Sequence, residues 1–132
     1  STAMNSRTVA ALQRAGFKIK HTGLGDENPE YAVSWNPDMQ PITCFSKTYA
    51  HSSNPQSQFA AIMTCSDADQ GCPLVHGAAA RFAIPYLDPK ISDGLPEESA
   101  TYDARSAQIG AEMYFLMAQV REQVTKHQAR SY

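Results

Sequence analysis

Two cysteines near the middle of the chain have a spacing that could support thiol chemistry. Cys65 and Cys72 enclose six residues, and Pro73 follows directly. In a helix the two thiols would share one face but lie about 10.5 Å apart along the axis, whereas a disulfide needs Cα atoms within about 7 Å of each other. Gly71 and Pro73 make local unwinding inexpensive. We therefore expect a Cys65–Cys72 disulfide to form only together with a change of conformation.

The same cysteines allow two other interpretations. Cys65 can be a buried thiol at the end of a strand and Cys72 an incidental one, which the spacing alone favours about as much as redox function. In a zinc site, Cys65, Cys72 and His76 would supply three ligands, with Cys44 or His51 as the fourth. The sequence lacks the short Cys-x2-Cys knuckle that is typical of zinc sites, so metal binding is the weaker alternative.

A carboxylic acid in a second segment could serve as a proton donor. Asp88 is followed by Pro89 and comes five residues after Ala83, in a short apolar run at residues 81–85. An aspartic acid held protonated beside a leaving group can act as a general acid. Asp-Pro is also a common turn pair, so the pair by itself favours a turn.

Two predicted strands must bring these groups together. Residues 59–64 form a continuous apolar run that ends directly at Cys65, as expected of a strand covered on both faces. Residues 81–85 are a shorter candidate and are followed by Asp88. In open α/β sheets, ligands bind at the carboxyl ends of the strands, so we expect Cys65 and Asp88 to share one edge of a parallel sheet.

Helices and further strands are predicted around this pair. Asn5 or Ser6 can cap a short helix that ends at Gly16. Residues 17–20 and 41–45 read as brief strands, and residues 21–37 as mostly loop. A helix is predicted from Pro96 to about Gln128 and should pack on the sheet through one apolar stripe. The stripe consists of Tyr102, Ile109, Met113, Leu116, Val120 and Val124.

The composition restricts the class of protein. The chain has 132 residues, of which 42% are hydrophobic and 18% charged, enough for one compact domain. The net charge is −2 and no Lys/Arg cluster follows one element, so a nucleic acid is not an expected partner. The sequence contains neither a membrane-length apolar stretch nor a signal peptide, and three cysteines are too few for a disulfide scaffold. We therefore expect a cytoplasmic protein.

A family resemblance is carried by the cysteine segment. Residues 63–73 (MTCSDADQGCP) closely resemble the redox segment of thioredoxin-coupled arsenate reductases, which share the fold of low-molecular-weight tyrosine phosphatases. Residues 2–5, the helix end at residues 15–17, and Asp88-Pro89 are further matches, the last being similar to the family's general-acid Asp-Pro. The resemblance covers most of the chain. It implies an α/β domain over residues 1–132, a partial, truncated form of a flavodoxin-like three-layer sandwich with a parallel sheet.

The resemblance also implies a relay of three cysteines. In the family, a phosphate-loop cysteine attacks arsenate while an aspartic acid protonates the leaving oxygen. Carried over, Asp88 is that acid, Cys65 is the second cysteine, which attacks the arseno-thiol adduct, and Cys72 is the third, which attacks the resulting disulfide. The implied partners are an oxyanion substrate, either arsenate or a phosphomonoester, and a thioredoxin-like reductant. No cofactor is implied.

The nucleophile of the family is missing from these residues. The family holds it in a Cys-x5-Arg loop that cradles the oxyanion, and no Cys-x5-Arg occurs in the sequence. Cys44 is followed six and seven residues later by Ala50 and His51, and neither is arginine, so it cannot substitute. A shortened chain, a partner chain that carries the loop, and a domain that lost catalysis are all possible. We favour the first, because loss of a central strand would expose residues 59–64.

Three functions follow as hypotheses. The first is an arsenate reductase whose acid and two resolving thiols lie in this chain, which we expect to be inactive alone. The second is a low-molecular-weight phosphatase that hydrolyses phosphomonoesters, since residues 31–53 are longer than expected of a dedicated arsenate reductase. The third is a non-catalytic module that binds metal or a partner, in which the cysteines are structural.

Overall fold

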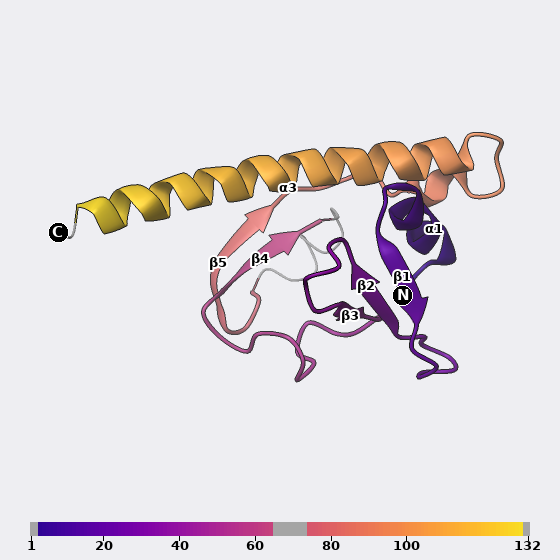
Figure 1. The fold of residues 1–132 in the computed structure, drawn as a ribbon, viewed down its shortest axis with the longest axis horizontal. Coiled ribbons are helices and arrows are strands. Elements are labelled where there is room, and N and C mark those ends of the chain that lie inside the picture. The colour runs from indigo at the N-terminus through magenta and orange to yellow at the C-terminus, as the bar shows by residue number, and fades with distance from the viewer. Residues whose placement is uncertain (1–2, 65–73, 131–132) are drawn as a thin grey trace.

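The structure is a computed structural model that describes residues 3–64 and 74–130. Within these ranges the chain forms two α-helices, one 3-10 helix and five strands (Figure 1). In chain order they are α1 (Ser6–Arg14), β1 (Lys18–His21), β2 (Tyr31–Ser34), β3 (Ile42–Cys44), β4 (Phe59–Met63), β5 (Ala78–Ala83), η1 (Pro89–Ser92) and α3 (Glu98–Ala129).

The strands form two small sheets. β1, β2 and β3 pair in that order as an antiparallel sheet, and β4 and β5 pair in parallel. The predicted α/β class and the parallel pairing of the two chemistry-bearing strands are confirmed. A single parallel sheet at the centre of a three-layer sandwich is not seen among the described residues, where the parallel sheet has two strands.

Residues 21–37 are mostly loop, as predicted, but they contain one strand that was not predicted. Residues 31–34 form β2, the middle strand of the antiparallel sheet, and pair with both neighbours. The Asn-Pro pairs at residues 28–29 and 36–37 read as turns, and β2 lies between them. Val33 is 6% exposed, and its burial stabilises a strand too short to show a clear alternation in the sequence.

The first helix was predicted correctly at both ends. The side chain of Asn5 accepts a hydrogen bond from the Arg7 N–H at 2.8 Å and so caps the helix. Gly16 has φ = 97°, the left-handed conformation that ends many helices. The face of α1 that carries Ala11 packs against α3.

The connection into the parallel sheet depends on one glycine. The N–H of Gln58 donates to the carbonyl of Gly77 at 3.0 Å just before β4 and β5 begin to pair. Gly77 has φ = 83°, and a Cβ atom there would lie 2.1 Å from the carbonyl oxygen of Gln56. β5 begins three residues earlier than predicted, at Ala78, because this turn delivers the chain directly into the ladder.

α3 runs along one side of the molecule, and its C-terminal half extends past β5 (Figure 1). Its first turns contact α1 and η1, where Tyr102 is 4% exposed. The predicted stripe does not continue into a buried face, since Leu116 is 37% exposed and Val120 45%. The stripe fails because residues 113–118 are apolar in every direction, whereas the extensive contacts of α3 within the described residues are those with α1 and η1.

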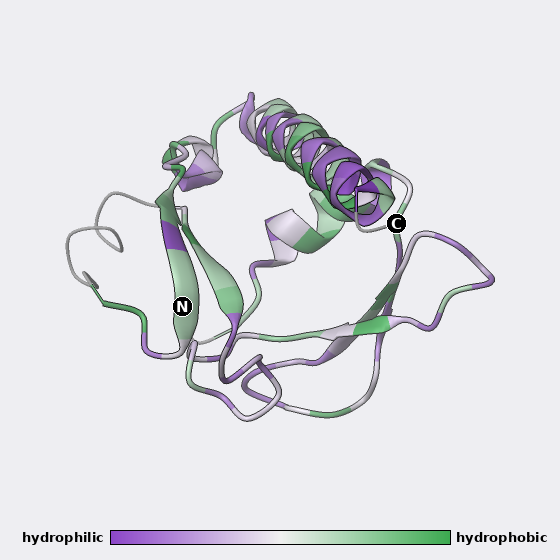
Figure 2. Cartoon of the chain, turned by 90° about the vertical axis from the view of Figure 1, so that its left-hand side faces the viewer, coloured by the Kyte–Doolittle hydropathy of each residue, from purple (hydrophilic) through white to green (hydrophobic). Residues whose placement is uncertain are grey.

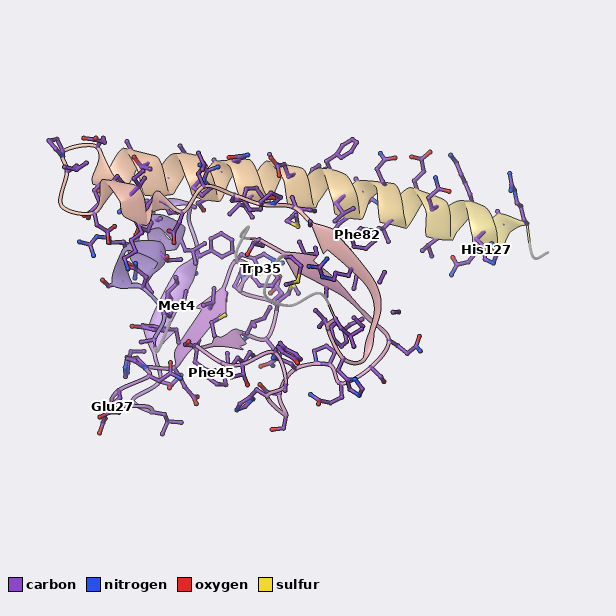
Figure 3. The ribbon with its side chains drawn as sticks, turned by 180° about the vertical axis from the view of Figure 1, so that it is seen from behind. Met4, Glu27, Trp35, Phe45, Phe82 and His127 are labelled. Carbon is purple, nitrogen blue, oxygen red and sulfur yellow. The ribbon has the colours of Figure 1, made fainter. Side chains whose placement is uncertain are left out.

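Two further views illustrate this arrangement. Apolar and polar residues are intermixed around α3 when it is viewed nearly end-on (Figure 2). His127 lies on the part of α3 that extends beyond the strands (Figure 3). Within residues 3–64 and 74–130, no helix combines the length and apolar character that crossing a membrane requires.

The buried apolar core is small for a chain of this length. Its members among the described residues are Ala11, Val33, Ala61, Val75 and Tyr102. No large side chain in the described part is completely enclosed. Tyr102 is therefore the main anchor that joins α3 to the rest of the fold.

Candidate functional site

A cleft between α1, η1 and α3 is the best-formed site of the described residues. Its volume is about 800 Å³, within the range of small-molecule sites. Its floor is apolar and includes Leu12, Phe17 and Ile109. Its polar lining residues are Asn5, Thr8, Asp88, Lys90, Tyr102, Arg105 and Ser106. Another depression, along residues 123–130, is formed by the end of α3 alone and so has no opposing wall.

Asp88 lies on the rim of this cleft. Its side chain is exposed and accepts a hydrogen bond from the Lys90 N–H at 3.0 Å, which caps η1. The turn predicted from Asp88-Pro89 is therefore present. The capping bond uses one carboxylate oxygen, and the rest of the group stays accessible to a molecule in the cleft.

The segment that carries Asp88 starts beside the end of β4. The N–H of Ile84 donates to the carbonyl of Met63 at 3.0 Å, and the N–H of Tyr86 donates to that of Thr64 at 2.9 Å. The parallel ladder thus continues to the residue directly before Cys65. Cys65 and Cys72 themselves lie outside the described residues, so the predicted proximity of Cys65 to Asp88 stays a prediction.

The described residues of the zinc alternative, Cys44, His51 and His76, do not form a metal site by themselves. Cys44 is a half-buried free thiol at the end of β3. His51 hydrogen bonds to Ser53 and stacks edge-on against Phe45, with ring centroids 5.3 Å apart. No cluster of three or more His, Cys, Asp or Glu side chains suited to a metal ion occurs in residues 3–64 and 74–130. Any zinc site would depend on the two undescribed cysteines.

A series of side-chain hydrogen bonds along α3 was not predicted from the sequence. The hydroxyl of Tyr86 donates to Glu112 Oε2 at 2.6 Å, and Gln108 Nε2 donates to Glu112 Oε1 at 2.9 Å. Arg105 in turn donates to the Gln108 side-chain oxygen. The helical spacing of residues 105, 108 and 112 was the available signal, because these positions share one face.

The hydrogen bond between Tyr86 and Glu112 shifts the pKa of both groups. The hydrogen bond to Glu112 raises the pKa of Tyr86, and burial adds to the effect. The same bond from Tyr86, together with that from Gln108, lowers the pKa of Glu112. Glu112 therefore stays ionised. Its bond to Tyr86, two residues before Asp88, fixes the segment after β5 to α3.

The opposite wall of the cleft is held by Tyr102. Its hydroxyl donates to Asp93 Oδ1 at 2.8 Å and accepts from Asn5 Nδ2 at 3.2 Å. Burial first, and then the bond to Asp93, raise the pKa of Tyr102. Arg7 lies 2.8 Å from Glu98 Oε2 and 3.5 Å from Asp93 Oδ1. The start of α1, the end of η1 and the start of α3 are thereby joined in one polar cluster.

The comparisons with known proteins add no relative to this description. No family model matches the chain, and searches of curated proteins and of solved structures find no significant match. The function must therefore be argued from the sequence resemblance and the geometry of the cleft.

Proposed function

We propose that this chain is part of an arsenate-reductase-like enzyme of the low-molecular-weight phosphatase superfamily, acting in the cytoplasm. The residues that support the proposal are the cysteine segment at 63–73 and Asp88-Pro89, which resemble the family's redox segment and general acid. The finer fold that we propose is a flavodoxin-like sandwich in which β4 and β5 belong to a larger parallel sheet.

One observation carries the proposal furthest. The bond from Tyr86 N–H to the Thr64 carbonyl joins the ends of two parallel strands at 2.9 Å. The segments bearing Cys65 and Asp88 therefore begin side by side, at the edge of the sheet where α/β enzymes bind ligands. Asp88 also borders a cleft of about 800 Å³.

In the proposed reaction, each residue has one role. Asp88 gives its proton to the oxygen that leaves arsenate when a phosphate-loop thiolate, supplied from outside these 132 residues, attacks arsenic. The Cys65 thiolate then attacks the sulfur of the adduct, which releases arsenite with two electrons and leaves a disulfide. Cys72 attacks that disulfide at Cys65 and frees the first thiol, and a thioredoxin-like dithiol reduces the Cys65–Cys72 bond.

The chain can be tested as it stands. Mild peroxide should produce a Cys65–Cys72 cross-link in peptide maps while Cys44 stays reduced, and hydrogen exchange should rise between residues 66 and 71. The eight-residue loop, counting both ends, restricts the unfolded chain by about 2.5 kcal/mol, so closure is feasible without strong self-stabilisation. Cys44→Ser is the matched control and should leave the cross-link unchanged. A cross-link to Cys44, or two thiols protected by bound zinc, would contradict the relay.

Phosphomonoester hydrolysis is the second candidate. It is favoured by the length of residues 31–53, a region that includes β2 and β3 and is longer than expected of a dedicated arsenate reductase. In a form of the protein that carries the phosphate loop, Asp88→Asn should reduce both activities by about 10²–10⁴-fold. Cys72→Ser should stop repeated arsenate turnover and leave phosphoester hydrolysis intact. Loss of hydrolysis in Cys72→Ser, or full activity in Asp88→Asn, would argue against this division of roles.

A further inference from the structure

The cleft combines an apolar floor with cationic side chains that lack full neutralisation. Arg105 and Lys90 contribute two positive charges to its lining, and Asp88 contributes the one carboxylate. The lining therefore carries a net charge of +1, from two cations and one anion, although the whole chain carries −2. An excess of positive charge over an apolar surface is suited to an amphiphilic anion.

Two of the neighbouring acids are already paired with other arginines. Asp103 lies 2.7 Å from Arg14, and Asp93 lies 3.5 Å from Arg7. Glu112 does not line the cleft and accepts from the neutral Tyr86 and Gln108, so it keeps its charge, which acts on Arg105. Within the described residues, Lys90 Nζ has no hydrogen bond or ion pair, and its carboxylate neighbour Asp88 instead binds the Lys90 main chain.

Arg105 is oriented but incompletely satisfied. Its guanidinium donates to Gln108, which is held by Glu112 and through it by Tyr86. Its Nε–H is shielded from solvent and has no acceptor in the described part of the chain. A shielded donor without an acceptor costs about 1–3 kcal/mol, so a shift of the Arg105 side chain that pairs its guanidinium with an anion in the cleft would be favoured. Because these hydrogen bonds already orient the Arg105 side chain, less conformational entropy is lost when it binds an anion.

We propose that the cleft between α1, η1 and α3 binds a small organic anion. A carboxylate or phosphate group contacts Arg105 and Lys90, and an apolar body lies over Leu12, Phe17 and Ile109. Guanidinium groups bind both kinds of anion through paired N–H donors. The site uses side chains and requires no phosphate loop. Its biological meaning rests on the proposed function, because Asp88 borders the same cleft, but its occupancy is measurable without turnover.

Titration of the reduced 132-residue chain tests the site, followed by calorimetry and by amide NMR shifts. The probes are phenyl phosphate and benzoate, with inorganic phosphate and benzyl alcohol as the head group and the body alone. The two organic anions should bind at least about tenfold more tightly than either part, with shifts at residues 8–17 and 105–110. Equal binding of inorganic phosphate, or of benzyl alcohol, would overturn the proposal. A preference for phenyl phosphate or for benzoate identifies the head group.

Substitutions locate the head group. Lys90→Gln, at an exposed position that is not expected to affect folding, should weaken both organic anions severalfold, and Arg105→Gln by about tenfold or more. Arg121→Gln removes the same charge from the exposed part of α3 and should change neither. Unchanged affinity in Lys90→Gln, with Arg105→Gln also unchanged or unfolded, would overturn the assignment.

Asp88 separates this site from the proposed catalysis. Asp88→Asn removes the one acid of the lining and should tighten anion binding, whatever its effect on turnover. If Asp88→Asn leaves turnover of the loop-bearing form intact while anions still bind, the general acid is wrong and the binding site stands. If turnover falls but no anion binds at Arg105 and Lys90, the proposed function stands and the binding site is wrong.

Discussion

The two ends of α3 belong to one continuous helix but differ in what supports them. In the first turns, Tyr102 is buried and Arg14 lies 2.7 Å from Asp103, so α3 is fixed to α1. In the second half, Tyr114 is 78% exposed and Phe115 66%, and the pair Lys126–Glu122 lies within the helix itself. Continuity of a helix therefore does not report tertiary packing. Residues such as Glu, Gln, Met and Ala sustain the second half through local propensity.

The strongest test of this contrast is Tyr102→Ala. Removing the buried ring should lower the free energy of unfolding by about 3–5 kcal/mol, because a cavity is left between α1 and α3. Tyr102→Phe is the matched variant: it keeps the ring and removes the hydroxyl that binds Asp93 and Asn5, at a cost of about 1–2 kcal/mol. Urea unfolding measures both. Equal small effects would mean that the first turns are no better supported than the second half.

The acid stability of the first turns should depend on Glu98. The Gly94 N–H, at 2.6 Å from Oε2, and then Arg7 lower the pKa of Glu98 in the folded chain. A lowered folded-state pKa gives stability that is present above the ordinary value of about 4.3 and is lost as pH falls through the folded value. As the pH falls from 6 to 3, the free energy of unfolding should therefore decrease less steeply in Glu98→Gln than in the original chain.

Arg7→Gln is the comparison variant for this pH dependence. It removes the second cause of the lowered pKa and leaves the Gly94 bond. The free energy of unfolding of Arg7→Gln should therefore still fall with acid more than that of Glu98→Gln does. Parallel curves for the original chain and Glu98→Gln would show that Glu98 is not held in this way.

The smallest effect is expected at Leu116. Its side chain is 37% exposed, and Leu116→Ala should change the free energy of unfolding by no more than about 0.5 kcal/mol. The sequence pattern alone predicts a buried residue and a cost of about 2–5 kcal/mol. A measured cost in that higher range would show that another surface covers the second half of α3, and the contrast between its two ends would then disappear.

Local signals in the sequence were sufficient for the helices and for the parallel pair. Asn5 and Gly16 mark the ends of α1, and the apolar run at residues 59–64 identifies β4, because capping and burial on both faces leave direct traces in the residue types. β2 was missed because Tyr31 to Ser34 lack the apolar–polar alternation that marked residues 17–20, and because they lie between two Asn-Pro turn signals. The sequence could not separate the covered from the uncovered length of α3, since exposure depends on which element lies opposite.

The candidate site was predictable only in part. Asp88 could be placed after β5 because the strand and the Asp-Pro turn are both local features. The cleft itself depends on Asn5 and Phe17, which flank α1, and on Arg105, which lies about 90 residues later on α3. No spacing rule connects them. Tyr86 was likewise hidden, because its partner Glu112 is 26 residues away.

The length of α3 also determines how the molecule moves in solution. A compact chain of 132 residues has a radius of gyration of about 14 Å, which corresponds to a sphere about 36 Å across. The 32 residues of α3 alone span about 48 Å. The particle is therefore a body with a rigid rod at one side, and its rotational diffusion is anisotropic. It tumbles end over end more slowly than its mass implies, while rotation about the helix axis stays fast.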